Sequence, residues 1–328
     1  MQASSTVSVC ENGPVGRGQH EASVRSNTAL CRDHWRLTLG LAALSPTRAG
    51  QFIQVACRNL RQDYSPQAEL DWEPGRALGL LGQELMSPLA LLRRPFSLAG
   101  RRDTDRGVEL DLIYRVVGVG TRWLADLKPG EPVQIIGPLG NHFELPPEDH
   151  TAVLVGGGVG IPPMLYLASQ LAGRTAVAIC GATTADLLPL TLCGSADDAV
   201  SPGQAVREFA EHGAASIITT DDGSAGRRGL VTEALETYLD AHRNQRQVVY
   251  TCGPEGMMKR VAAIAGQRGI ACQVSVERAM ACGMGTCQSC CIRVRKSDPQ
   301  QPPLAGKDWA WRLACTDGPV FRGEDLLW

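Results

Sequence analysis

Length, composition and charge describe an ordinary globular protein and exclude several classes. The chain has 328 residues, of which 44% are hydrophobic and 20% charged, and its 32 basic and 34 acidic side chains give a formal net charge of −2. Such a balance creates no global field that would recruit nucleic acid or an anionic membrane. No apolar run reaches the roughly 18 residues of a membrane span, and the length predicts two or three domains.

Residues 1–27 are rich in Ser and Gly and poor in large apolar side chains. A segment of this composition buries too little apolar surface to offset the entropy of ordering, so we expect a mobile tail. Organelle transit peptides are rich in arginine and poor in acidic residues. This segment contains Glu11, Glu21 and only two arginines, so it does not fit that pattern well. No signal peptide is recognisable here, and we expect a cytoplasmic location.

Residues 28–148 have the pattern of an all-β domain. Short alternating segments such as WRLTLGL, QFIQVAC and VELDLIYRVV are separated by Gly and Pro, which predicts a β-barrel or sandwich. A polar and then Leu-rich stretch at 59–92 interrupts the pattern. Compact domains seldom carry so long a loop, so it is either an excursion that faces a partner or a short helix laid over the barrel.

Two stretches of this domain could hold an anionic cofactor. In Arg93–Ser97, a guanidinium can form paired hydrogen bonds to a diphosphate, and a serine hydroxyl can reach a ring heteroatom. In Tyr114–Thr121, glycines let backbone N–H groups approach phosphate just before a short helix expected at 123–127. Each has an ordinary alternative, because an arginine pair at a strand edge is commonly solvated.

Residues 149–270 change to an α/β pattern. TAVLVGGGVGIPPMLYLASQLAG predicts a buried strand, a glycine turn and a helix with Pro162 and Pro163 in its first turn. Strands at TAVAICGA, AASIITT and QVVYTCG alternate with helix-like segments around 201–212 and 229–242, which predicts a doubly wound parallel sheet. The glycine turn is compressed relative to G-x-G-x-x-G, so it indicates either a dinucleotide site or a tight packing turn.

Two further strand ends carry unusual residues. Thr220–Ser224 closes one strand and Thr251–Glu255 closes another. Ligands of doubly wound sheets bind at the carboxyl ends of the strands. Cys252 therefore has a functional interpretation beside a nicotinamide, and an ordinary one as a small buried residue.

Residues 271–328 contain the most specific motif of the chain. Cys282, Cys287 and Cys290 are separated by four and then two residues, and Cys315 follows after 24 more. This is the plant-type ferredoxin order of thiolates around a 2Fe-2S cluster. Gly283 and Gly285 fit the same interpretation, because a loop that turns thiolates onto iron needs positive φ angles and close backbone approach.

Other uses of these cysteines fit less well. A structural zinc site usually repeats a close pair of cysteines, whereas here three are clustered and one is distant. Disulfides are disfavoured because most of the remaining cysteines are scattered singly in apolar surroundings. Cys291 could replace Cys290 as a ligand, but the spacing favours Cys290, and in an extended segment the neighbouring side chain points the opposite way.

From about residue 28 to the C-terminus, the sequence resembles the electron-transfer subunit of NAD-dependent dihydroorotate dehydrogenase. The resemblance rests on RRPFSLAG, LIYRVVGVGT, GPLGNHF, LVGGGVGIPPML, TDDGSAGRRGLVTEAL, YTCGPEGMMKRV, SVERAMACGMGTCQSC and CTDGPVF, in this order. The wider ferredoxin-NADP reductase superfamily shares single blocks, but the cysteine loop with CTDGPVF is typical of this subunit and its near relatives. The resemblance implies an FAD-binding β-barrel at 28–148, an NAD-binding α/β domain at 149–270 and a 2Fe-2S domain at 271–328.

The resemblance also implies roles for individual residues. Those implied for FAD are Arg94, Pro95, Phe96, Ser97, Tyr114, Arg115, Gly120 and Thr121. Those implied for the nicotinamide site are Gly156, Gly157, Gly158, Gly160, Asp222, Gly223, Cys252, Gly253 and Pro254. Those implied as iron ligands are Cys282, Cys287, Cys290 and Cys315. No side chain is expected to act as a catalytic acid or base.

The function implied is electron transfer in pyrimidine biosynthesis. Electrons from a dihydroorotate-oxidising, FMN-containing catalytic subunit would pass through 2Fe-2S and FAD to NAD+, because flavin alone exchanges electrons both singly and in pairs. The implied assembly with that subunit is a heterotetramer. Two alternatives are a diaphorase subunit of a hydrogenase or of a ferredoxin:NADP+ oxidoreductase, and a zinc-stabilised binding module on a degenerate flavoprotein.

Overall fold

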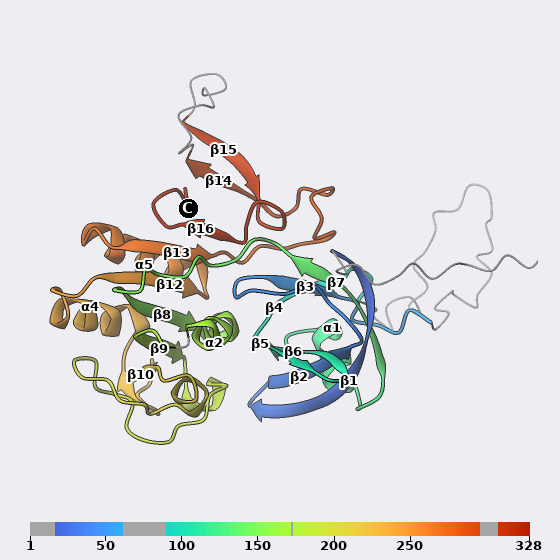
Figure 1. Ribbon diagram of the computed structural model, residues 1–328, viewed down its shortest axis with the longest axis horizontal. Helices are drawn as coiled ribbons and strands as arrows, with labels where there is room; N and C mark the ends of the chain where they lie inside the picture. The colour runs from blue at the N-terminus through green and yellow to red at the C-terminus, as the bar shows by residue number, and fades with distance from the viewer. Residues whose placement is uncertain (1–16, 62–89, 172, 296–307) are drawn as a thin grey trace, which may run out of the picture.

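The structure, a computed structural model, describes residues 17–61, 90–171, 173–295 and 308–328. Two seven-stranded sheets lie side by side, and a small two-stranded sheet lies above both (Figure 1). The expected combination of an all-β barrel with a parallel α/β sheet is confirmed. The Leu-rich stretch expected at 59–92 lies largely outside the described residues.

The first sheet is antiparallel and has the order β4-β3-β7-β1-β2-β6-β5. Its strands are β1 (Gly18–Cys31), β2 (His34–Leu41), β3 (Phe52–Val55), β4 (Arg94–Ser97), β5 (Gly100–Thr104), β6 (Gly107–Arg115) and β7 (Pro132–Leu139). Alternate residues of β6 are buried over its first half, as expected for a strand with one face on a core. Helix α1 (Val119–Ala125) follows β6 and begins four residues before the helix expected at 123–127.

Strand β1 corrects the predicted tail. It begins at Gly18 and pairs with β7 from Gly18 to Ser23 and with β2 from Ser23 to Cys31. Residues 18–27 therefore belong to the barrel, although composition alone predicted a mobile segment up to residue 27. Their small and polar side chains suit a strand of which only Ala22 and Val24 are fully buried.

The second sheet has the order β11-β10-β9-β8-β12-β13-β16, parallel except for β16. Its strands are β8 (Thr151–Gly157), β9 (Ala176–Ala182), β10 (Ala215–Thr220), β11 (Arg227–Arg228), β12 (Gln247–Cys252), β13 (Ala271–Ser275) and β16 (Val320–Arg322). Helices α4 (Val231–Ala241) and α5 (Glu255–Gln267) cover one face. The helix expected around 201–212 is only the single turn α3 (Arg207–Ala210).

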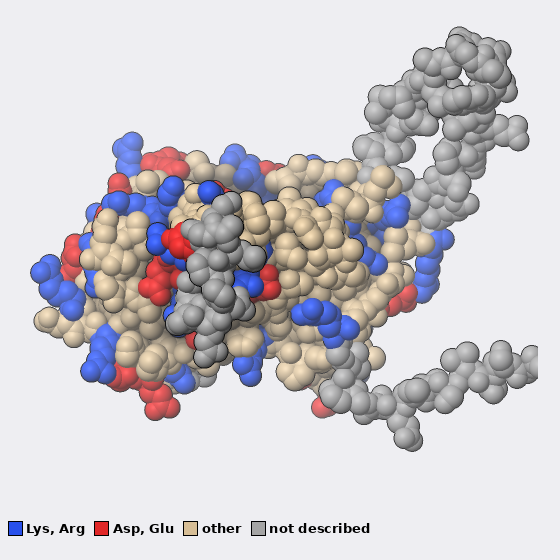
Figure 2. All heavy atoms as spheres, turned by 90° about the horizontal axis from the view of Figure 1, so that it is seen from above, with Lys and Arg blue, Asp and Glu red and all other residues tan. Residues whose placement is uncertain are grey.

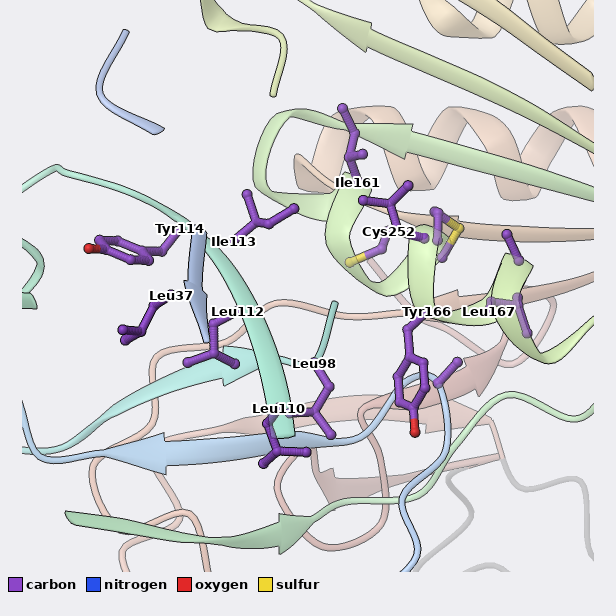
Figure 3. Close-up of a cluster of buried hydrophobic side chains, with 14 of the residues drawn as sticks. Leu37, Leu98, Leu110, Leu112, Ile113, Tyr114, Ile161, Tyr166, Leu167 and Cys252 are labelled. Carbon is purple, nitrogen blue, oxygen red and sulfur yellow. The ribbon is translucent and has the colours of Figure 1, made fainter. Parts of the chain in front are cut away.

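Helix α2 (Ile161–Gln170) covers the other face and joins the two sheets. All eight of its residues from Ile161 to Ala168 are buried, and they share one apolar core with barrel residues such as Leu110 and Leu112 (Figure 3). In the middle of α2, the Tyr166 hydroxyl donates a hydrogen bond to the Thr47 carbonyl at 2.8 Å. The prolines fall at the start of the helix, as predicted.

The C-terminal lobe is attached to both sheets. Strands β14 (Cys291–Arg295) and β15 (Trp309–Leu313) form its antiparallel pair. Its core contains Cys290 and Cys315 together with Phe52 of the barrel and Met258 of α5. The boundary expected at 271 differs from the structure, because β13 and β16 belong to the parallel sheet.

Basic and acidic side chains are interspersed over the face seen from above (Figure 2), in agreement with the balanced composition. In the part of the chain that the structure describes, no helix has the length and apolar character needed to cross a membrane.

The contact between α2 and the barrel yields a stability prediction. Replacing Tyr166 with Phe removes the donor to the Thr47 carbonyl and the 2.7 Å contact with the Thr47 hydroxyl, both of which are buried. We expect the free energy of unfolding, measured with urea, to fall by about 1–3 kcal/mol. Tyr238→Phe is the control, because no hydrogen bond of its hydroxyl occurs among the described residues, and it should change stability by less than about 0.5 kcal/mol. Equal effects of the two changes would contradict the role given to Tyr166.

Candidate functional site

A cavity of about 1520 Å³ lies where the barrel, the parallel sheet and the C-terminal lobe meet. Most of the expected flavin and nicotinamide residues line it, namely Arg94, Pro95, Phe96, Ser97, Tyr114, Arg115, Gly120, Thr121, Gly157, Gly158, Gly160, Cys252 and Pro254. The lining continues to Met280, Ala281 and Ser289 of the cysteine loop. Most residues expected for FAD and the nicotinamide therefore border one continuous space that reaches the cysteine loop, whereas Cys282, Cys287, Cys290 and Cys315 do not line it.

Strand β4 forms one wall of the cavity and presents an aromatic surface. Phe96 packs edge-on against Tyr114, with ring centroids 6.0 Å apart. The Tyr114 hydroxyl donates to Asn27 Oδ1 at 3.3 Å, and burial raises the pKa of Tyr114. This hydroxyl therefore stays protonated at neutral pH and holds its ring in place. An apolar, aromatic wall of this kind suits an isoalloxazine ring.

Two arginines, Arg94 and Arg115, line the cavity at this wall, and Arg93 lies next to Arg94 in the sequence. Arg93 donates to the Gln134 carbonyl at 3.0 Å and is held against the barrel. Arg94 donates to the Leu92 carbonyl at 2.9 Å from one guanidinium nitrogen. Nε of Arg115 is buried and has no hydrogen-bond partner among the described residues. Because Arg94 and Arg115 both line the cavity, this donor set fits a diphosphate.

The turn before α1 approaches the wall closely. A Cβ atom added to Gly120 would lie 3.1 Å from the Cβ of Cys57, so a larger residue would press on the barrel. The Thr121 hydroxyl accepts from the backbone N–H groups of Val117 and Gly118 and donates to the Gly118 carbonyl. Thr121 thus shapes the turn, and its hydroxyl is already hydrogen-bonded within it.

The glycine turn after β8 combines both interpretations offered by its sequence. A Cβ at Gly160 would lie 2.1 Å from the Cys252 carbonyl oxygen, and one at Gly156 would lie 3.1 Å from the Ile161 Cα. These two glycines serve tight packing. Gly158, at φ +52°, has no heavy atom within 4 Å of an added Cβ and lines the cavity. The turn therefore packs the fold and also leaves open backbone for a ligand.

Cys252 ends β12 beside Ser275, its partner in β13. Burial raises the pKa of the Cys252 thiol to about 12, and a hydrogen bond with the Ser275 side chain offsets part of this shift. The thiol is therefore neutral at physiological pH. It offers the cavity a small, uncharged surface rather than a base.

Four of the expected nicotinamide residues do not line the cavity. Gly156 and Gly253 lie behind its wall, where Gly253 adopts φ +151° against Gly157. Asp222 and Gly223 are exposed in the turn after β10. There the Asp222 carboxylate accepts from the backbone and hydroxyl of Ser224, which lowers its pKa. The neighbouring Asp221 lines the cavity instead.

The cysteine loop joins β13 to β14. Gly283 and Gly285 have φ angles of +72° and +90°, as the sequence predicted for a loop of this kind. The sulfur of Cys282 accepts the backbone N–H groups of Met284 and Cys287, each at 3.4 Å. Backbone donors aimed at a thiolate stabilise its charge.

Cys287 lies on the exposed side of the loop. Its sulfur is 3.2 Å from the Ser289 hydroxyl. Hydrogen bonds from the Ser289 hydroxyl and backbone, followed by those involving Cys282, lower the pKa of Cys287 to about 6. The Ser289 hydroxyl oxygen also accepts the backbone N–H of Ala281 at 3.2 Å, which ties the loop together.

Cys290 and Cys315 lie on the inner side, only 2% and 1% exposed. Burial and the adjacent Cys290 thiol raise the pKa of Cys315 to about 12. Cys291 is exposed at the start of β14, opposite Leu313. The structure thus separates the two adjacent cysteines, with Cys290 directed inward beside Cys315.

The four thiols lie in one region but are not gathered around a single point. Among the described residues, no three His, Cys, Asp or Glu side chains are placed to hold a metal ion. A 2Fe-2S cluster takes its four thiolates around two irons, so it suits a wider arrangement than a single zinc ion does.

Sequence reasoning missed several residues of the cavity wall, and Ser275 and Phe52 illustrate two reasons. Ser275 ends β13 at the carboxyl edge of the parallel sheet, so the strand-end rule applied to Thr251–Glu255 would also have found it. Phe52 lines the cavity from β3, but it belongs to no motif. Only the packing of β3 against the C-terminal lobe identifies it.

Comparisons with known proteins agree with this geometry. Residues 277–327 match the family described as the iron-sulfur cluster binding domain of dihydroorotate dehydrogenase B. The dihydroorotate dehydrogenase B (NAD(+)) electron transfer subunit of Caldanaerobacter subterraneus is 33% identical over 95% of this chain and 99% of its own. That of Geobacillus thermodenitrificans is 37% identical over 78% of this chain and 87% of its own.

Solved structures extend the likeness over the whole fold. An NADH-dependent reduced ferredoxin-NADP oxidoreductase, studied for flavin-based electron bifurcation, matches with a TM-score of 0.66 at 25% identity, over 97% of this chain and 92% of its own. The Amycolatopsis cytochrome P450 reductase GcoB matches with a TM-score of 0.53 at 25% identity, over 80% and 70% of the two chains. This chain therefore belongs to the family of dihydroorotate dehydrogenase B (NAD(+)) electron transfer subunits.

Proposed function

We propose that this chain carries electrons from a dihydroorotate-oxidising subunit to NAD+, with FAD and a 2Fe-2S cluster bound at the cavity. The observation that carries the proposal is the continuity of the cavity from β4, past the glycine turn and Cys252, to Ser289 of the cysteine loop. Flavin exchanges electrons singly or in pairs, whereas iron–sulfur clusters take single electrons and nicotinamide takes pairs. A cavity that runs from the expected flavin residues to the cysteine loop suits such an exchange.

The barrel side of the cavity would bind and orient FAD. Arg94 and the buried Nε of Arg115 would neutralise the diphosphate. Pro95 and Phe96 would line the ring, and the Ser97 hydroxyl would reach a ring heteroatom. Tyr114, Gly120 and Thr121 would shape the remainder of the binding surface, consistent with the hydrogen-bonded turn before α1.

The parallel sheet would bind NAD at its carboxyl edge. Gly157, Gly158 and Gly160 bring backbone to the cavity without side chains that would block a dinucleotide, and Pro254 lines the same cavity. Cys252, with its thiol neutral, would pack beside the nicotinamide and exclude water. The four expected residues that do not line the cavity would act indirectly. Gly156 and Gly253 would hold the backbone behind this surface, and Asp222 and Gly223 would hold the turn after β10.

The cysteine loop would hold the cluster near the molecular surface. Met284 and Trp311 are apolar side chains on this lobe, and they are 51% and 59% exposed. Exposed apolar side chains in such a place suit a partner that excludes water and brings its own cofactor close. We propose an FMN-containing dihydroorotate dehydrogenase catalytic subunit as this partner, in a cytoplasmic heterotetramer.

A second function has one specific observation in its favour. The solved oxidoreductase with a TM-score of 0.66 resembles this chain over nearly its whole length, which supports a role as the diaphorase subunit of a ferredoxin:NADP+ oxidoreductase or hydrogenase. The 33% identity to a dihydroorotate dehydrogenase subunit along 95% of the chain favours the first proposal. A zinc-stabilised module is less favoured, because residues 277–327 match a family described as an iron-sulfur cluster binding domain.

The assignment of the iron ligands can be tested with adjacent cysteines. Cys290→Ala removes a buried thiol beside Cys315 and should abolish iron binding. Cys291→Ala removes an exposed thiol and should leave the iron content unchanged. Iron and sulfide assays on the two purified variants give the answer. Loss of iron from the Cys291 variant alone would reverse the assignment.

The division of labour with a catalytic subunit can be tested on the isolated chain. The barrel, the parallel sheet and the cysteine lobe account for the described residues, and none of them is the roughly 250-residue (β/α)₈ barrel that we expect of a dihydroorotate site. With NAD+ and dihydroorotate, the purified chain should form no orotate, although with NADH it should reduce ferricyanide. Orotate formed by the chain alone would contradict the proposal. So would failure of NADH to reduce the acceptor in flavin-loaded protein.

A further inference from the structure

The amide of Gln54 lies between the β4 strand and the cysteine loop, and its surroundings do not satisfy it. Gln54 is 0% exposed on β3, and neither Nε2 nor Oε1 has a hydrogen-bond partner among the described residues. Buried amides are nearly always hydrogen-bonded. An orphaned amide of this kind therefore points to a group that belongs beside it.

The direction of the Gln54 side chain identifies that group. A Cβ built on Gly283 would lie 2.6 Å from Cγ and 2.9 Å from Nε2 of Gln54, so the amide lies against the backbone of the cysteine loop. Side chains alternate along a strand, so Gln54 shares a face of β3 with Phe52. Phe52 packs in the same apolar core as Cys290 and Cys315.

The same residue is joined to the flavin side by the sheet. Gln54 is the register partner of Pro95 in β4, and Pro95 lines the cavity between Arg94 and Phe96. The amide is thus one strand away from the proposed flavin wall and in contact with the cysteine loop. Gly283 supports this closeness, because any side chain there would collide with Gln54.

We propose that Gln54 Nε2 donates a hydrogen bond to a sulfur atom of the 2Fe-2S cluster and thereby sets its reduction potential. A donor near sulfur stabilises the more negative, reduced form, so it raises the potential. The inference rests on the proposed function, since it requires the cluster to occupy the cysteine loop. Gln54 acts through the cluster and takes part in no bond-making step.

The test compares variants of similar size in the full-length protein. Gln54→Met keeps the unbranched chain but removes the amide. Gln54→Asn withdraws the amide by one methylene and serves if the Met variant fails to fold. Ile53→Val is the matched control, because Ile53 lies on the same strand but faces the barrel core.

The readouts are iron content, the electron paramagnetic resonance spectrum of the reduced cluster and its midpoint potential. Both Gln54 variants should bind iron and show an altered spectrum. Each should have about tenfold less reduced cluster at a fixed ambient potential, which is about 59 mV for a one-electron couple. Ile53→Val should match the wild type in all three.

Each outcome separates this inference from the proposal beneath it. Wild-type protein without iron and sulfide would overturn the proposed cluster itself. Iron-loaded Gln54 variants with the wild-type spectrum and potential would overturn only the role of Gln54. Loss of iron from both Gln54 variants, while Ile53→Val retains its iron, would overturn the proposal that Gln54 tunes the potential, because both variants are expected to keep the cluster.

Discussion

The close packing of Gly160 against the end of β12 is the constraint on which the site depends. An added Cβ at Gly160 would lie 2.1 Å from the Cys252 carbonyl oxygen, so only glycine lets the turn after β8 lie on β12. This packing fixes the start of α2, and eight buried residues of α2 then hold the barrel against the parallel sheet. The cavity is the space left where the carboxyl ends of β8 and β12 meet β4.

The C-terminal lobe completes the cavity because it is anchored on both sheets. Its core contains Phe52 and Leu139 of the barrel, Met258 and Ala262 of α5, and Cys290 and Cys315. Strand β16 returns the chain to the edge of the parallel sheet, beside β13. The cysteine loop is thereby held near β3 and β4 rather than tethered at a distance, and short separations are what electron transfer between bound groups needs.

Local patterns in the sequence predicted the parts of the fold that depend on local chemistry. The alternation in β6, the prolines at the start of α2 and the positive φ angles of Gly283 and Gly285 all follow from nearest-neighbour rules. The strand at Gly18 was missed because its stability comes from pairing with β7, more than a hundred residues away. Gln54 was missed for a similar reason, since its position beside Gly283 arises only from the packing of the lobe. The end of β10 was predicted correctly at Thr220, but Asp221 lines the cavity rather than Asp222, the residue that the resemblance implied.

We infer that one chain holds a flavin at the cavity and a 2Fe-2S cluster in the cysteine loop beside it. The most direct measurement is anaerobic purification of the wild-type protein, followed by its visible spectrum and assays for flavin, iron, sulfide and zinc. We expect a coloured protein with about one FAD, two irons and two sulfides per chain. A colourless protein that contains zinc and no flavin would contradict it.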